Sequence, residues 1–158
     1  AKHYNALVHT DAAQAIGRIP CDFKNLGVDF MTLSSLKVGG PAGVGALIAK
    51  EKLPLAPLLL GGGQERSKRA GTLNAAGICG FAAAITEATQ EDWHPCQMLR
   101  DELELSLLRL TPEARIFSQQ APRLPNTTCI SFPQHRSDKY VMLYDLEGIA
   151  ISSGSACS

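Results

Sequence analysis

The sequence has 158 residues, 45% of them hydrophobic, and its 15 Lys and Arg residues balance its 15 Asp and Glu residues. This hydrophobic content excludes a disordered chain and predicts either one good-sized core or a large piece of a two-domain protein. Neither sign of charge forms a long run, so the sequence indicates no surface for nucleic acid or an anionic membrane. We therefore expect small molecules and other proteins as ligands.

The start of the sequence does not have the pattern of a targeting segment. No apolar stretch reaches the length of a membrane-spanning helix, and the first residues lack both an initiating Met and the basic-then-apolar order of a secretory signal. We therefore expect a chain without a membrane segment that begins inside a longer protein.

The five cysteines are odd in number and widely spaced, with no pair at the C-x-x-C spacing of a metal site. They are Cys21, Cys79, Cys96, Cys129 and Cys157. This spacing predicts neither a disulfide framework nor a zinc site, and it indicates a reducing compartment such as the cytoplasm, or the mitochondrial matrix in a eukaryote. We expect the first four to be packing residues, and no metal site at the isolated histidines.

Strands and helices alternate in the first part of the chain. Short β-rich runs predict strands at 6–10, 28–34 and 44–49, and an Ala-rich stretch predicts a short helix at 12–16. A glycine-rich turn at 37–43 separates the last two strands. This alternation predicts an α/β architecture with a largely parallel sheet.

An extended connection and an apolar helix follow. Pro54 and Pro57 predict an extended path for 53–60. The Ala-rich stretch 73–88 is apolar nearly all round, so it predicts a buried helix packed against the sheet.

A change of composition at 90–95 predicts a domain boundary that divides the chain into 1–90 and 91–158. The second part is predicted to begin with an amphipathic helix at 93–110. Its leucines recur at four-residue spacing, at Leu99, Leu103 and Leu107. The remaining elements expected are a strand at 127–132, a helix at 139–146 and a strand at 148–152.

Two polar residues follow predicted strands. Lys37 lies just before Gly39 and Gly40, where it is either a solvated loop lysine or, if desolvated or beside other cations, an amine that can form a Schiff base with an aldehyde cofactor. Asp11 ends the first strand, and ligands gather at the carboxyl ends of parallel strands. Its carboxylate can hold a protonated ring nitrogen or cap the following helix, and Gln14 can share that cap or reach a ligand oxygen.

Two further segments carry polar or nucleophilic groups. The segment 61–72 offers Arg66, Arg69 and Thr72 as donors to an anionic group, although a plain surface turn fits equally. The segment 152–158 places the thiol of Cys157 at the end of small, loose residues, which is typical of a mobile nucleophile.

The candidate residues lie in a series of short motifs. They are His9-Thr10-Asp11-Ala12-Ala13-Gln14, Ser34-Ser35-Leu36-Lys37, the stretch 39–47, Gly61-Gly62-Gly63-Gln64-Glu65-Arg66 with Arg69-Ala70-Gly71-Thr72, Leu124-Pro125-Asn126-Thr127, and Ser152 to Cys157. Their order resembles that of the NifS-like cysteine desulfurases, which are class V pyridoxal phosphate enzymes. The form of the terminal loop resembles the first of the two desulfurase groups, whose cysteine lies on a long mobile loop.

The resemblance implies a fold-type I transferase architecture that depends on pyridoxal 5'-phosphate. The back half of the large domain, with its mainly parallel sheet, would lie in 1–90, and part of the small domain in 91–158. The reaction implied removes sulfur from L-cysteine, giving L-alanine and a persulfide on Cys157. The partners implied are a second copy of the chain and a sulfur-acceptor protein such as an iron–sulfur scaffold.

The resemblance also implies a role for each site residue. Lys37 would carry the cofactor and shuttle protons, Asp11 would pair with the ring nitrogen, and Gln14 would bind the ring hydroxyl. Ser34 would bind the phosphate, and Thr72 would reach the phosphate in the partner subunit.

Two departures from the family pattern leave other functions open. Leu36 replaces the usual histidine, which predicts phosphate binding weaker by about 1 to 3 kcal/mol. The family's N-terminal portion and the arginine that grips the substrate carboxylate are not in the sequence. A truncated desulfurase acting as a non-catalytic interaction module, and a selenocysteine lyase, therefore remain alternatives. An aminotransferase is disfavoured because it needs no cysteine at position 157.

Overall fold

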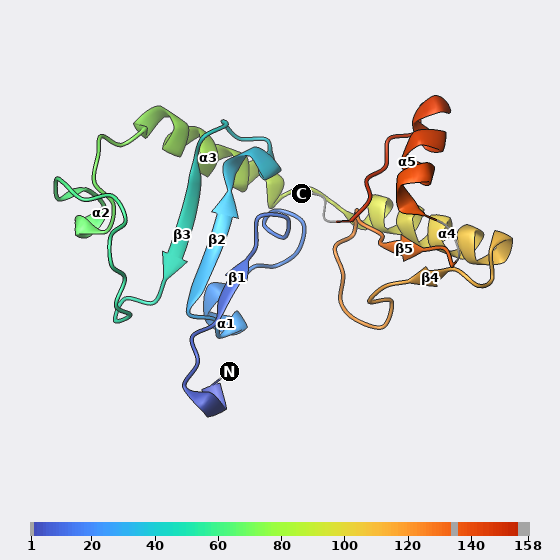
Figure 1. The fold of residues 1–158 in the computed structure, drawn as a ribbon. Helices are drawn as coiled ribbons and strands as arrows, with labels where there is room; N and C mark the ends of the chain where they lie inside the picture. The colour runs from blue at the N-terminus through green and yellow to red at the C-terminus, as the bar shows by residue number, and fades with distance from the viewer. Residues whose placement is uncertain (1, 134–135, 155–158) are drawn as a thin grey trace. The chain divides into compact units, whose positions relative to one another are not determined.

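The computed structural model describes residues 2–133 and 136–154, with the side chain of residue 2 left out. The chain divides into two compact units, Ala1–Asp92 and Trp93–Ser158 (Figure 1). Each unit is described by itself below.

A three-stranded sheet forms the centre of the first unit. Its strands are β1 (His9–Asp11), β2 (Phe30–Ser34) and β3 (Gly45–Ala49), in the order β1-β2-β3. β1 and β2 are parallel, whereas β3 is antiparallel to β2. The expected parallel arrangement is therefore wrong for β3. The connection from β2 to β3 is too short for a parallel crossover, which needs a dozen or more residues.

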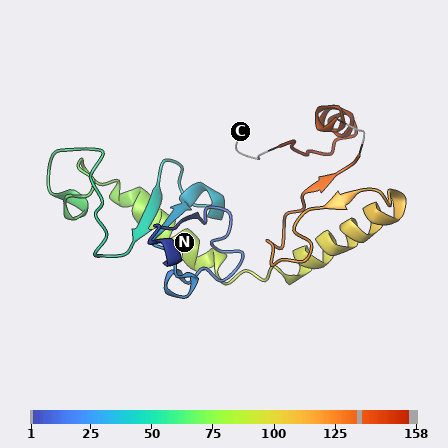
Figure 2. The same cartoon turned by 60° about the horizontal axis from the view of Figure 1, so that its bottom comes forward.

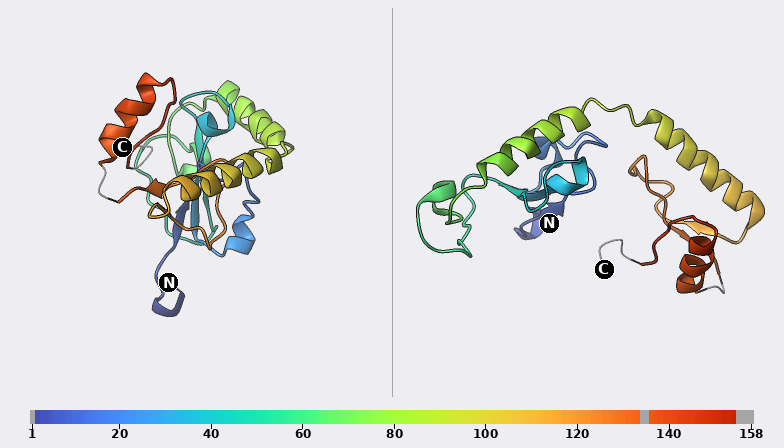
Figure 3. Two further views of the ribbon diagram at one scale, coloured as in Figure 1. Left: turned by 90° about the vertical axis from the view of Figure 1, so that its right-hand side faces the viewer. Right: turned by 90° about the horizontal axis from the view of Figure 1, so that it is seen from above.

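One helix, α3 (Ala75–Ala88), covers one face of this sheet, as the right-hand view of Figure 3 shows. Met31 and Leu33 point from β2 toward it and pack with Phe81 of α3 in the buried core. Burying each of these side chains contributes about 1.5–3 kcal/mol. The expected helix at 73–88 is thus present, but only one side of it is buried, since Ile78 and Cys79 are exposed.

The segment after β1 differs from the expected short helix at 12–16. Ile16 and Ile19 donate helix-like backbone bonds to Ala12 and Ala15, yet residues 13–18 form successive turns without a regular helix. Gly17 interrupts them because its φ is +77°. A Cβ on Gly17 would lie 2.7 Å from that of Ala88, so the glycine also lets the end of α3 approach closely.

Short helical segments complete the first unit. They are η1 (Lys2–Tyr4), α1 (Phe23–Leu26), η2 (Ser35–Val38) and α2 (Gln64–Ser67). The sequence analysis did not predict α1, although Asp22 caps it by accepting bonds from Lys24 N and Asn25 N. In α2, the backbone of Glu65 and Arg66 is left-handed, so α2 is a kinked turn and not a regular helix.

The second unit contains α4 (His94–Leu110), β4 (Arg115–Ile116), β5 (Ile130–Ser131) and α5 (Ser137–Leu146). β4 and β5 form an antiparallel pair, and Figure 2 shows α4 running beside it. The two helices match their predicted positions within a few residues. The strand expected at 148–152 is wrong, because this segment is irregular and exposed.

The buried face of α4 differs from the one that its leucines predict, although Leu107 is partly buried. Leu99 is 67% exposed and Leu103 50% exposed, whereas Glu104 is the residue of this helix that is buried, at 3%. The carboxylate of Glu104 is therefore buried on α4. Leu99 and Leu103, two of the three leucines at four-residue spacing, are in contact with solvent.

Two of the four cysteines that we expected to be packing residues are not buried. Cys79 and Cys129 are exposed, while Cys21 and Cys96 are partly buried. Burial raises the pKa of the Cys21 thiol above its ordinary value. Within the described residues, no helix is long and apolar enough to cross a lipid bilayer.

Candidate active site

The parallel strands β1 and β2 end side by side, and their last residues carry two of the predicted site groups. Asp11 is the last residue of β1 and Ser34 the last of β2. The register pairs Asp11 with Thr32, so the side chains of Asp11, Thr32 and Ser34 lie on the face away from the core. His9 shares this face, where a hydrogen bond of 2.7 Å joins its Nε2 to Thr32 Oγ1.

Asp11 shapes the turn that follows β1. Its Oδ1 accepts a hydrogen bond of 2.9 Å from Ala13 N, while Ala12 N donates to the backbone oxygen of Thr32. The side chain thus caps the turn, as one reading of the sequence proposed. Among the described residues Oδ2 has no hydrogen-bond donor, and the side chain is exposed, so one carboxylate oxygen can accept from a ligand.

Lys37 lies on η2, directly after β2. Ser35, at the start of this short helix, is fully buried, donates its N–H to Val44 O, and accepts the N–H of Gly40. A Cβ on Gly40 would lie 2.3 Å from Ser35 Oγ, so the absence of a side chain lets residue 40 approach Ser35 closely. The Lys37 side chain is half-buried, and the neighbouring Leu36 is exposed.

A residue that the sequence analysis missed connects these two segments. Arg18 donates from Nη1 to Gln14 O at 2.9 Å and from Nη2 to Lys37 O at 3.0 Å. Its spacing of four residues after Gln14 was the available signal, because residues at i and i+4 are neighbours in helix-like turns. The contact with Lys37 depends on the tertiary fold and has no local signal.

The other predicted site residues are not brought into this group. Thr72 is exposed in the irregular segment between α2 and α3. No hydrogen bond within the described part of the chain joins it to Asp11, Gln14 or Lys37. Cys157 lies outside the described residues, and the preceding residues 151–153 are irregular and exposed.

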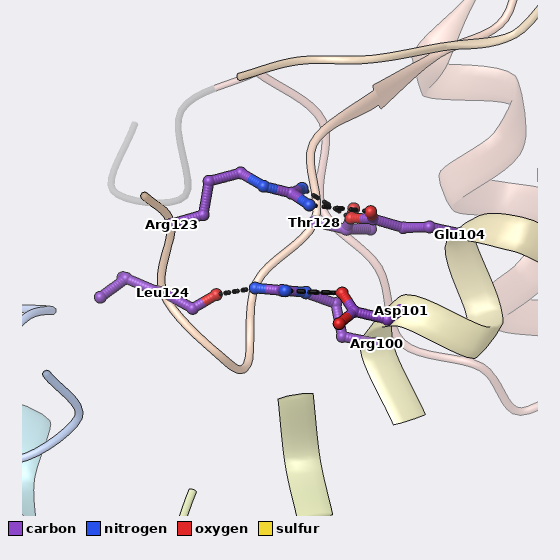
Figure 4. Close-up of polar contacts among 6 residues, drawn as sticks. All are labelled: Arg100, Asp101, Glu104, Arg123, Leu124 and Thr128. Atoms are coloured by element: carbon purple, nitrogen blue, oxygen red, sulfur yellow. Dashed lines mark hydrogen bonds and ion pairs between the residues drawn. The ribbon is translucent and has the colours of Figure 1, made fainter. Parts of the chain in front are cut away.

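The second unit has a cavity of its own, of about 510 Å³, beside a network of charged side chains (Figure 4). Arg123 donates two hydrogen bonds, of 2.7 and 2.9 Å, to the buried carboxylate of Glu104, which also accepts from the Thr128 hydroxyl. The bonds from Arg123 hold the pKa of Glu104 below its ordinary value. Arg100 pairs with Asp101 and donates to Leu124 O at 2.5 Å.

This network is internally neutralised, because each guanidinium has a carboxylate partner. None of the predicted site residues lines the cavity. Across residues 2–133 and 136–154, no cluster of three or more side chains has the composition of a metal site.

Comparison with known proteins gives a consistent result. The aminotransferase class-V family model matches residues 1–158. The chain is 42% identical over 158 residues to a cysteine desulfurase of Cereibacter sphaeroides, covering 100% of this chain and 41% of the relative. It is 41% identical over 155 residues to the cysteine desulfurase NifS of Azotobacter vinelandii, covering 96% of this chain and 39% of the relative.

Among solved structures, the NifS-like protein of Rickettsia africae ESF-5 is similar in fold, with a TM-score of 0.84 and 40% identity. The match covers 98% of this chain and 43% of that protein. The chain therefore spans about two fifths of the length of these relatives. The predicted partial α/β fold and the resemblance to NifS-like proteins are confirmed, and since the family match extends over the whole sequence, the chain belongs to the aminotransferase class-V family.

Proposed function

We propose that this chain forms part of a pyridoxal 5'-phosphate-dependent cysteine desulfurase, which removes sulfur from L-cysteine to give L-alanine and a persulfide on Cys157. The observation that supports this most strongly is the arrangement at the ends of β1 and β2. There the Asp11 carboxylate and the Lys37 turn lie on adjacent segments that Arg18 connects. The relatives named cysteine desulfurase supply the reaction.

The donors present fit this cofactor by their chemistry. Asp11 has a carboxylate oxygen available for a protonated ring nitrogen, and Lys37 provides an amine for an aldehyde. Gln14 offers an exposed carboxamide for the ring hydroxyl, and the hydroxyl of Ser34 suits a phosphate oxygen. Leu36 adds no donor, so we expect phosphate binding to be weaker than in relatives with histidine there. Thr72 of a second copy would add another phosphate ligand in a homodimer.

In the proposed reaction, the bound cofactor supplies the electron sink that stabilises negative charge next to the substrate's amino group. Lys37 Nζ would take the proton from the substrate's Cα and return it later. The Cys157 thiolate would attack the substrate sulfur, so that an S–S bond forms and the C–S bond breaks. The electron pair of that bond stays with carbon, which takes up a proton to become the methyl group of alanine.

The remaining assignments belong to the same proposal. Residues 1–90 would form the cofactor-binding part of the large domain, and 91–158 part of the small domain that carries Cys157. The persulfide would pass to an acceptor protein such as an iron–sulfur scaffold, in a reducing compartment such as the cytoplasm.

The test is sulfide release from L-cysteine by the chain supplied with pyridoxal phosphate and reductant, beside Cys157→Ala and Lys37→Ala. We expect turnover that disappears in both variants. Turnover unaffected by Cys157→Ala would refute the persulfide step. Cofactor absorbance without sulfide would limit the chain to cofactor binding, and neither signal would favour the non-catalytic module. A parallel assay with L-selenocysteine decides between desulfurase and selenocysteine lyase.

A further inference from the structure

We propose that Arg18 is a positioning residue, which holds the turn bearing Lys37 against the turn that carries Asp11 and Gln14. This inference rests on the proposed function, because in that function Lys37 and Asp11 bind the same ligand. Its basis is a pair of hydrogen bonds from one guanidinium. Nη1 donates to Gln14 O at 2.9 Å, and Nη2 donates to Lys37 O at 3.0 Å.

The two carbonyls belong to segments far apart in the sequence. Gln14 lies four residues before Arg18, whereas Lys37 lies 19 residues after it, beyond α1 and β2. A planar guanidinium presents several N–H groups in a fixed fork, so it can bond both carbonyls at once. A lysine ammonium at the end of a flexible stem is a single point and has no such fork.

The backbone around Arg18 directs its side chain to this position. Gly17 is buried, and a Cβ placed on it would contact Val38 Cγ1 at 3.4 Å, so residue 17 lies directly against η2. The next residue, Arg18, is half-buried and reaches the carbonyl of Lys37, the neighbour of Val38. The guanidinium of Arg18 therefore has only a short distance to span to the carbonyl of Lys37.

The contacts leave the reactive groups available. Arg18 bonds the main-chain oxygens of Gln14 and Lys37, and neither the carboxamide of Gln14 nor the amine of Lys37 takes part. Fixing the carbonyl of Lys37 fixes the backbone from which its side chain starts. Arg18 thus acts on the amine only through the backbone, by limiting the directions in which Nζ can point.

The experiment compares Arg18→Gln and Arg18→Lys with the wild-type chain and with a control, Arg136→Gln. Arg136 has a 78% exposed side chain and belongs to the second unit, so this variant controls for the loss of one positive charge. The first measurement needs no cofactor. It is hydrogen exchange of the Gly39 and Gly40 amides, which donate to Ser35 O within the Lys37 turn.

We expect exchange at these two amides to become about tenfold to a hundredfold faster in Arg18→Gln, since two charged hydrogen bonds are lost. The amide of Leu33 in the sheet, and the Gly39 and Gly40 amides in Arg136→Gln, should keep wild-type rates. Arg18→Lys should give an intermediate rate. A uniform increase across the sheet would instead indicate general destabilisation and would overturn the positioning role.

The second measurement is covalent capture of Lys37. The protein is treated with pyridoxal phosphate, reduced with borohydride and mapped by mass spectrometry, and the labelling of Lys37 is compared with that of exposed Lys24. We expect the ratio of Lys37 to Lys24 to fall about tenfold in Arg18→Gln and to recover partly in Arg18→Lys. If Arg18→Gln fails to fold, the Arg18→Lys variant carries both measurements.

The two readouts separate this inference from the proposed function. A wild-type chain in which Lys37 is labelled no more than Lys24 would contradict the proposed function, while hydrogen exchange would still decide whether Arg18 holds the turn. Preferential labelling of Lys37 that Arg18→Gln leaves unchanged would overturn the role of Arg18 and leave the proposed function standing.

Discussion

Arg123 donates two parallel hydrogen bonds, of 2.7 and 2.9 Å, to the carboxylate of Glu104. Glu104 belongs to α4, and Arg123 lies in the irregular segment between β4 and β5. The side chain of Arg123 is 14% exposed and that of Glu104 is 4% exposed, so the pair has little contact with water. A buried bidentate pair of this kind ties that segment to the helix, and it makes either partner costly to remove alone.

Replacing Glu104 by Ala should lower the free energy of unfolding of the second unit by about 3–5 kcal/mol, because Arg123 keeps a buried charge without its partner. The measurement is urea denaturation followed by the fluorescence of Trp93, the single tryptophan, which lies at the start of α4. Trp93 belongs to the second unit, so its fluorescence is chosen to follow the unfolding of that unit.

Two further variants control this prediction. Glu102→Ala removes a carboxylate from the same helix, but Glu102 is exposed and forms no ion pair with another described residue, so the loss should stay within about 1 kcal/mol. The double variant Glu104→Leu with Arg123→Met should recover most of the stability, since no buried charge remains. A double variant as unstable as Glu104→Ala would contradict the account.

The same pair predicts an acid-sensitive second unit. Arg123 holds the pKa of Glu104 below its ordinary value of 4.5, so the folded-state pKa lies below that of the unfolded chain. The pair's contribution is then complete above about pH 5 and is lost as the pH falls through the folded-state pKa. Urea denaturation at a series of pH values from neutral to acid should show a steeper loss of stability in the wild type than in Arg123→Met.

The exposed Asp138 titrates in the same acid range, since Arg136 holds its pKa below the ordinary value too. Its contribution is common to both proteins and cancels in the comparison. Parallel pH curves for wild type and Arg123→Met would rule out the assignment to Glu104.

Replacing Gly40 by Ala should destabilise the first unit by about 1–3 kcal/mol, as overpacking does in a tight interior. The new Cβ would lie 2.3 Å from Ser35 Oγ and 3.2 Å from Ala84 Cβ. Thermal denaturation followed by circular dichroism measures the effect. Gly63→Ala is the matched control, because the nearest atom to its Cβ is 3.8 Å away and its φ of −80° suits any residue.

Ser35 provides a test of the same contact from the other side. Its Oγ is buried and has no hydrogen-bond partner among the described residues, so Ser35→Ala should be neutral or slightly stabilising. The combination Ser35→Ala with Gly40→Ala should regain part of the stability lost in Gly40→Ala. Strictly additive effects of the two changes would show that the clash with Oγ is not the cause.

The sequence predicts those features of the fold that depend on nearby residues. Strand β2 and helices α3 and α4 follow from local apolar runs and their periodicity, and all are present. The direction of β3 was missed because it depends on a short connection and not on the strand's own residues. The face that α4 buries was missed because the bonds between Glu104 and Arg123 join residues 19 apart. Likewise, Asp11 and Lys37 could be named from their motifs, whereas the link between them through Arg18 exists only in the folded chain.

Replacing Asp11 by Asn should separate the two roles of this side chain. An Asn oxygen can still accept the bond from Ala13 N, so the turn after β1 should keep its shape. The negative charge that would stabilise a protonated ring nitrogen is lost, and the affinity for pyridoxal phosphate should fall about tenfold to a hundredfold. An absorbance titration with pyridoxal phosphate measures the affinity, and circular dichroism checks the fold.

The matched control is Asp22→Asn, at the exposed cap of α1, where Asn caps a helix as well as Asp does. This variant loses the same charge from the same unit, so its affinity for pyridoxal phosphate should stay at the wild-type value. Equal affinities in Asp11→Asn and Asp22→Asn would mean that the carboxylate at the end of β1 serves only the turn. Capping the turn would then be the whole role of Asp11, and other residues would have to hold the cofactor.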